Sequence, residues 1–198
     1  IHDRTTGETT LVTVATDGTP GNAHIDITDL SADGRYVVFQ TTTNSMVPMD
    51  KNGSMDVFVR DVVKGETTRI SIAGNGDEAD GPSRGGTISA DGRYVAFLST
   101  APNLGSGPYW TIFVHDRTTG ETQRIAAGSG ENTEAIISDN GAYVVFSSSS
   151  ELHPDDTNLN VDIYRATVAG NDLELVSRDV NGDVIYMDAT APTVSADG

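Results

Sequence analysis

The chain has 198 residues, 36% of them hydrophobic, and its 12 basic and 29 acidic side chains give a formal net charge of −17. So acidic a surface repels phosphate backbones, which excludes nucleic acid from the expected partners. The absence of cysteine excludes disulfides and thiolate metal sites. No apolar run reaches the roughly 18 residues that span a bilayer, so no membrane insertion is expected.

Two short signatures recur along the chain and indicate a repeat protein. The first reads SADGRYVVF from Ser31, SADGRYVAF from Ser89, SDNGAYVVF from Ser138 and a bare SADG from Ser195. The second reads HDRTTGETT from His2, RDVVKGETT from Arg60, HDRTTGETQ from His115 and the weaker RATVAGNDL from Arg165. Both recur every 49 to 58 residues, so the repeat unit holds about 50 residues.

Each repeat is expected to contain four short strands. Stretches such as 93–97 alternate apolar and polar residues and are rich in β-branched and aromatic types. The pairs Asp33-Gly34, Asp91-Gly92 and Asn140-Gly141 lie between two such stretches, where a tight hairpin turn needs a positive φ. No window has a helical apolar period with caps, so no substantial helix is expected.

Four-stranded repeats of this kind are typical of β-propeller blades. The predicted fold is all-β, with four-stranded antiparallel blades whose strands we name A to D from the propeller axis outward. Three blades would be complete, with parts of flanking blades at both ends. Residues 1–30 would hold strands C and D of one blade and its exit loop, 31–88, 89–137 and 138–194 would be three repeats, and 195–198 would start the next. We expect a segment of a larger propeller, with the remaining blades in the same parent chain.

The SADGRYVAF hairpin, followed by DVFVRD and then by GETTRIS, resembles the TolB-like family of propeller repeats. The resemblance covers essentially the whole chain, and blade three departs most, with Ala142 in place of arginine. It implies a β-propeller, often bacterial and periplasmic or on the cell surface, that serves as a protein-binding platform or an accessory domain. It carries no catalytic residue over to this chain.

Two loops between strands B and C are candidates for calcium sites. They place oxygen-bearing side chains at alternate positions, as in the first half of an EF-hand loop, and calcium takes six to eight oxygen ligands. The candidate ligands are Asp50, Asn52, Ser54 and Asp56 in the first repeat, and Asp156, Asn158, Asn160 and Asp162 in the third. The alternative is that these side chains hydrogen-bond their own backbone in Asx turns.

Further candidates lie at the entrance of the innermost strand and in a shortened loop. His24, Glu131 and Asp188 lie seven residues before three of the four signatures, with Pro82 at this position before the second. They would face the axial channel and either bind a ligand there or remain as solvated loop residues. Tyr109 and Trp110 would stack on a sugar, anchor a protein partner or pack between blades. The acidic residues Asp77, Glu78 and Asp80 are interpreted as a solvated face.

These patterns favour a binding or scaffold module without catalytic activity. Its rim loops would recognise a protein or a carbohydrate, with calcium as a possible cofactor, in the periplasm or outside the cell. Gly-x-Ser-x-Gly, His-Glu-x-x-His and phosphate-binding glycine loops are absent from the sequence. The alternative is an accessory or catalytic propeller domain of a secreted hydrolase, lyase or peptidase.

Overall fold

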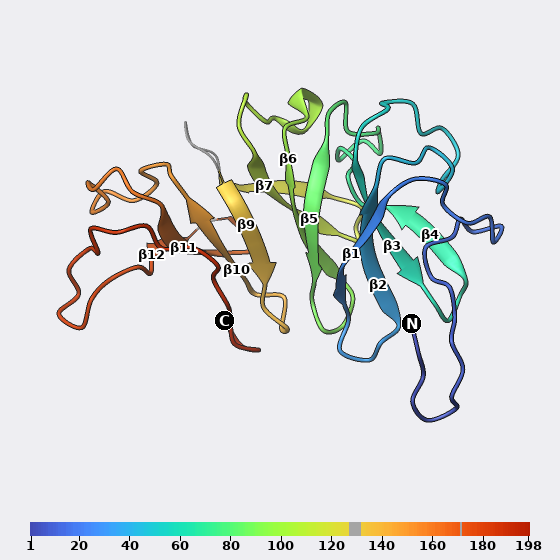
Figure 1. Ribbon diagram of the computed structural model, residues 1–198. Helices are drawn as coiled ribbons and strands as arrows, with labels where there is room; N and C mark the ends of the chain where they lie inside the picture. Colours follow the sequence, from blue (N-terminus) through green and yellow to red (C-terminus); the bar gives the residue numbers. More distant parts are fainter. Residues whose placement is uncertain (127–131, 171) are drawn as a thin grey trace.

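The computed structural model describes residues 1–126, 132–170 and 172–198, and it contains three four-stranded antiparallel sheets (Figure 1). The first sheet holds β1 (Ile25–Leu30), β2 (Tyr36–Thr41), β3 (Asp56–Asp61) and β4 (Glu66–Arg69). The second holds β5 (Ser83–Ile88), β6 (Tyr94–Ser99), β7 (Thr111–Asp116) and β8 (Thr122–Ala126). The third holds β9 (Asn132–Ile137), β10 (Tyr143–Ser148), β11 (Asp162–Thr167) and β12 (Leu173–Leu175).

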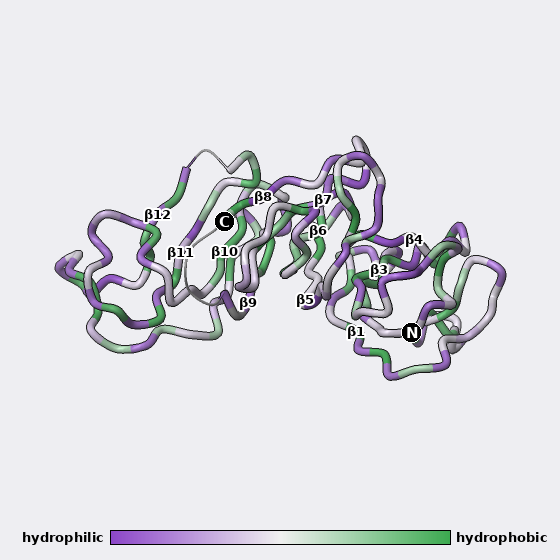
Figure 2. The backbone as a smooth tube through the Cα atoms, turned by 90° about the horizontal axis from the view of Figure 1, so that it is seen from above, coloured by the Kyte–Doolittle hydropathy of each residue, from purple (hydrophilic) through white to green (hydrophobic). Residues whose placement is uncertain are grey.

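Within each sheet the strands follow one another in chain order, so every sheet is one propeller blade. The only helical element among the described residues is the 3-10 turn η1 (Pro102–Leu104). The prediction of an all-β fold with three complete four-stranded blades is confirmed. Seen from above, blades one and three lie at the two ends of an open arc, with blade two between them (Figure 2).

The SADG signature is the hairpin turn between strands A and B. The Ser31 hydroxyl donates to Asp33 (2.7 Å) and accepts the Tyr36 N–H (2.9 Å), while Gly34 adopts a φ of 72°. The same bonds recur in blades two and three through Ser89, Asp91 and Tyr94, and through Ser138, Asn140 and Tyr143. The signature recurs because the turn needs a small hydroxyl, a short acceptor and a glycine.

A second repeated contact joins the two hairpins of a blade. Arg35 makes a bidentate pair with Asp61 (2.8–3.2 Å), and Arg93 makes the same pair with Asp116 in blade two. Because the arginine neutralises it and nearby backbone N–H groups bond to it, the pKa of each aspartate falls to about 2. Blade three has Ala142 at the arginine position and lacks this pair.

The hydrophobic core lies between neighbouring blades. Stacked rings, such as the Phe97 and Phe113 pair with centroids 5.7 Å apart, pair strands B and C inside each blade. The interface of blades one and two contains Val38, Val57, Val59, Ile70, Ile88, Val95, Phe97 and Phe113. The interface of blades two and three is larger and includes Leu98, Ile112, Val144, Phe146, Tyr164 and Leu175. Each blade therefore depends on its neighbour to cover its apolar face.

The chain ends continue the repeat pattern. At the N-terminus, His2 and Thr9 form an isolated bridge within a short hairpin, outside any named strand, where the sequence predicted strands C and D of a blade. At the C-terminus, the Ser195 hydroxyl donates to Asp197 (2.8 Å), as in the other SADG turns. The predicted division of the chain into repeats and flanking parts stays a prediction.

Candidate functional site

Strand pairing brings the B–C loops to one rim of the propeller. Ile25 pairs with Thr41, and Thr41 pairs with Asp56, so the start of strand A and the loop between strands B and C lie at the same end of the blade. The three loops span residues 42–55, 100–110 and 149–161, and we call them together the B–C rim. The loops from strand D to the next strand A reach the same rim.

In blade one, the B–C loop is closed by an Asx turn. The side-chain oxygen Oδ1 of Asn52 accepts the Ser54 N–H at 2.7 Å, and the side-chain amide Nδ2 donates to the Ala79 backbone carbonyl (2.8 Å) and to Asp56 (2.9 Å). Asn52 thereby ties the B–C loop to the following D–A loop. This geometry agrees with the Asx-turn alternative for Asn52.

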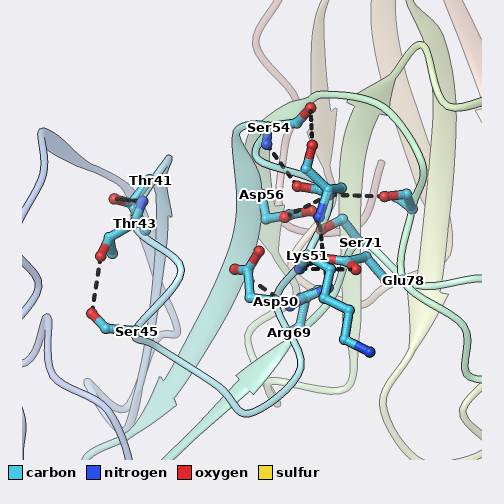
Figure 3. Close-up of polar contacts among 12 residues, drawn as sticks. Thr41, Thr43, Ser45, Asp50, Lys51, Ser54, Asp56, Arg69, Ser71 and Glu78 are labelled. Atoms are coloured by element: carbon cyan, nitrogen blue, oxygen red, sulfur yellow. Dashed lines mark hydrogen bonds and ion pairs between the residues drawn. The ribbon is translucent and has the colours of Figure 1, made fainter.

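Three carboxylates meet at this point. Oxygen atoms of Asp50, Asp56 and Glu78 lie within 4.8 Å of one another (Figure 3). Arg69, at the end of β4, lies beside them, with Nη2 3.3 Å from Asp50 and Nη1 2.5 Å from Glu78. The side chains of Arg69 and Asp50 are only 7% and 4% exposed, so this is a buried ion pair. Blade one therefore carries its own cation at the predicted calcium loop.

The surroundings of each carboxylate shift its pKa differently. Burial raises the pKa of Asp56 to about 6, against hydrogen bonds from Ser71 (2.6 Å) and Asn52. Burial also raises the pKa of Asp50, opposed by Arg69. Burial would raise the pKa of Glu78 as well, but backbone N–H groups and Arg69 outweigh it and lower that pKa.

Glu78 and Arg69 were not predicted as parts of a site. Asp77 and Asp80 are exposed, as the interpretation of a solvated acidic face requires, but Glu78 turns inward to Arg69 and accepts the Lys51 N–H (3.0 Å). A comparison of repeats offers a signal, because strand D ends on Arg69 in blade one and on Leu175 at the paired position in blade three.

The B–C loop of blade three repeats this turn with other neighbours. The side-chain oxygen Oδ1 of Asn158 accepts the Asn160 N–H (2.7 Å), and the side-chain amide Nδ2 donates to the Ile185 backbone carbonyl (2.7 Å). Asp162 accepts the Ser177 hydroxyl at 2.5 Å, and Asp156 accepts the Tyr164 hydroxyl. Three of the predicted ligands of the third repeat, Asp156, Asn158 and Asn160, therefore lie in the B–C rim, and the fourth, Asp162, begins β11 directly after it.

The shortened loop of blade two holds the aromatic pair. Tyr109 is exposed, whereas Trp110 is half-buried and packs against the core between blades two and three. The Arg84 guanidinium lies 4.1 Å from the centre of the Trp110 ring. The geometry of Trp110 thus agrees with the alternative of packing between blades.

The predicted channel residues have separate partners. His24 is largely exposed and pairs with Asp26 (2.9 Å), while Asp188 accepts the Val161 N–H (3.0 Å) in blade three. Glu131 lies outside the described residues. No contact between His24 and Asp188 is found in the described part of the chain.

The B–C rim also carries large apolar side chains in solvent. Met49 is 71% exposed and Leu159 82%, and Tyr109 lies between them in the middle loop. Met49 and Leu159 have φ angles of 67° and 61°, in the left-handed region that side chains rarely adopt. Two unfavourable features, exposure and backbone conformation, coincide at both residues.

Fold and rim together define a segment of a β-propeller. No family model and no curated protein matches the chain. Solved structures do match it. A TolB protein from Agrobacterium tumefaciens superposes with a TM-score of 0.55 and 20% identity, over 78% of this chain and 49% of that one. TolB from Acinetobacter baumannii gives a TM-score of 0.50 and 18% identity, over 88% of this chain and 36% of that one.

Proteins of other kinds share the fold. The β-propeller domain of the Trilobed protease from Pyrococcus furiosus superposes with a TM-score of 0.51 and 12% identity, over 78% of this chain and 42% of that domain. This chain spans less than half the length of each of these three proteins. The likenesses confirm that the chain has the fold of a TolB-like propeller segment. No helix among the described residues is long and apolar enough to cross a membrane.

Proposed function

We propose that this propeller segment is a binding module without catalytic activity, which recognises a protein or a carbohydrate through its B–C rim. The observation that carries the proposal is the exposure of Met49, Tyr109 and Leu159 in the three consecutive loops of that rim. Apolar and aromatic side chains held in solvent at one rim are typical of interaction sites.

The positions of His2 and His115 support a structural role for these two rings over a catalytic one. His2 and His115 bond to Thr9 (2.8 Å) and Thr122 (2.9 Å) at equivalent places in the repeat. Burial, and then the charge of Arg117, lower the pKa of His115 to about 4. Both rings therefore have the same structural place in the repeat, in which each ring joins the two strands of a hairpin.

The location that fits this proposal is the periplasm or the cell exterior. The resemblance to TolB-like propellers supports an exported protein, and the net charge of −17 suits a protein or glycan partner better than a polyanion. An accessory propeller domain of a secreted hydrolase, lyase or peptidase has the same fold and would use the same rim to guide its substrate.

The proposal is tested with variants on the two opposite rims. Met49→Ser, Tyr109→Ala and Leu159→Asn combined remove the apolar groups of the B–C rim, while Val63→Ser removes an equally exposed group (75%) at the C–D turn of the other rim. Immobilised chains are incubated with a periplasmic extract and with a carbohydrate array. We expect the wild type and Val63→Ser to retain the same partner and the triple variant to lose at least about 90% of it, since hot-spot losses exceed about 1.4 kcal/mol. Equal retention by all three chains would refute the proposal.

A further inference from the structure

Blades one and three build their B–C loops on the same frame. Ser71 donates to Asp56 at 2.6 Å, and Ser177 donates to Asp162 at 2.5 Å. The amides of Asn52 and Asn158 each reach a carbonyl of the following D–A loop, at 2.8 and 2.7 Å. Asp156 and Asp162 in blade three therefore correspond to Asp50 and Asp56, which lie close together in blade one.

The two blades differ in what faces these carboxylates. Strand pairing places Arg69 opposite Phe58 in blade one and Leu175 opposite Tyr164 in blade three. The guanidinium is thus replaced by a buried leucine, and a phenylalanine by a tyrosine whose hydroxyl donates to Asp156. The tyrosine supplies a hydrogen bond but no positive charge.

Blade three therefore buries two carboxylates that are incompletely paired. Asp156 is 4% exposed and Asp162 is fully buried. One oxygen of each, Oδ1 of Asp156 and Oδ2 of Asp162, is buried and has no hydrogen-bond partner among the described residues. No ion pair with a basic side chain is found for either aspartate in the described part of the chain. Unpaired buried carboxylate oxygens are costly and call for a counter-charge.

Both carboxylates lie beside the same side chain. The Tyr164 hydroxyl donates to Asp156, and Asp162 is two residues before Tyr164 in β11, so the side chains of Asp162 and Tyr164 are on the same face of the sheet. The equivalent carboxylates of blade one, Asp50 and Asp56, likewise lie close together.

We propose that Asp156 and Asp162 bind a calcium ion through their two unpartnered oxygens, at the place where blade one holds the Arg69 guanidinium. Calcium is the cation class that fits, because it is a hard ion that takes carboxylate, carbonyl and water oxygens in flexible geometry. Zinc prefers nitrogen and sulfur ligands, and magnesium demands a stricter octahedral set. The site does not depend on the proposed partner binding at the rim.

The first test is thermal unfolding of the 198-residue chain with calcium chloride and with EDTA. At a calcium concentration about 100 times Kd, we expect the midpoint to rise by about 5–10 °C, because the ion binds only the folded state. Asp156→Asn and Asp162→Asn should each abolish the rise. Asp56→Asn, the matched change in blade one, should keep it, because Arg69 already supplies the charge there.

A second readout does not depend on stability. Terbium replaces calcium at oxygen sites, and tyrosine within a few ångströms sensitises its emission. We expect emission from the wild type on tyrosine excitation, and its loss in Asp162→Asn with an unchanged circular dichroism spectrum. Tyr164→Phe, which recreates the Phe58 arrangement of blade one, should reduce the emission but retain the calcium-dependent midpoint.

Two outcomes would overturn the proposal. One is the absence of both the midpoint shift and the terbium emission in the wild type. The other is a calcium response that survives in the Asp156→Asn and Asp162→Asn double variant, or that disappears only in Asp56→Asn, which would assign the ion to another place in the chain.

Discussion

Arg69 and Leu175 occupy the same place in strands β4 and β12, and this difference separates two loops of closely similar sequence pattern. With Arg69 in place, the carboxylates of Asp50 and Glu78 are neutralised inside the protein. With Leu175 in place, blade three has two buried carboxylates that no basic side chain of the described residues pairs with. A single position in strand D thus decides whether the loop above it supplies its own counter-charge.

Replacing Arg69 by leucine should destabilise the protein strongly. Arg69→Leu leaves the buried Asp50 and the partly buried Glu78 without their partner, and breaking a buried ion pair in this way costs about 3–5 kcal/mol. The measurement is urea denaturation at neutral pH in EDTA. The control is Lys64→Met, because Lys64 and Glu66 are exposed and 3.9 Å apart, and such pairs contribute at most about 1 kcal/mol. Equal losses in both variants would contradict this account of Arg69.

The glycine of each SADG turn closes the hairpin within its own blade, and in most of these turns it also packs against the preceding blade. A Cβ added at Gly92 would lie 2.1 Å from the Tyr36 ring of blade one, and one added at Gly198 would lie 2.1 Å from the Tyr143 ring of blade three. The glycine therefore permits a positive φ and also allows the turn to pack on the tyrosine of the preceding blade. Among the four SADG glycines, only Gly34 of blade one has no tyrosine ring packed against it.

This pair of roles can be separated by alanine substitution. Gly34 and Gly92 have almost the same φ, 72° and 73°, but nothing lies within 4 Å of a Cβ at Gly34. Gly34→Ala should cost about 1–2 kcal/mol, the penalty of a left-handed conformation alone. Gly92→Ala should cost at least about 1 kcal/mol more, because the Tyr36 ring must move. Chemical denaturation of the two variants measures the difference. Equal losses in the free energy of unfolding would show that the Tyr36 ring moves aside at no cost.

The three blades form an open series, in which the outer faces of blades one and two are each covered by the next blade and that of blade three is not. Ile70 and Val176 follow strand D in blades one and three, and each donates its N–H to a strand C carbonyl at 2.8 Å. Ile70 is 1% exposed under blade two, whereas Val176 is 46% exposed on the outer face of blade three. A groove of about 570 Å³, lined by Val145, Ile163, Val176 and Val194, marks this outer face.

The difference in burial between Ile70 and Val176 predicts that truncating each to alanine lowers the stability by different amounts. Ile70→Ala removes methyl and methylene groups from a packed interface and should cost about 2–4 kcal/mol. Val176→Ala removes groups that are already in contact with water and should cost less than about 1 kcal/mol. The free energies of unfolding of the two variants provide the check. A large loss in Val176→Ala would mean that the outer face is covered in solution.

The sequence by itself determined the repeat, the four strands of each blade and the propeller class. It could do so because these depend on local rules: alternation of apolar residues along strands, and turns that require serine, aspartate and glycine at fixed spacing. The Asx turns at Asn52 and Asn158 also depend on a local rule, since each side chain accepts a hydrogen bond from the backbone N–H two residues further along the chain.

Only the tertiary structure decided what surrounds the rim residues. Glu78 and Arg69 meet Asp50 because a D–A loop folds back on a B–C loop. Trp110 is half-buried because it packs against the core between blades two and three, with Arg84 of β5 over its ring. Neither contact has a fixed spacing in the chain. Burial then sets the electrostatics, so that the same pattern of acidic residues is internally neutralised in blade one and left with unpartnered oxygens in blade three.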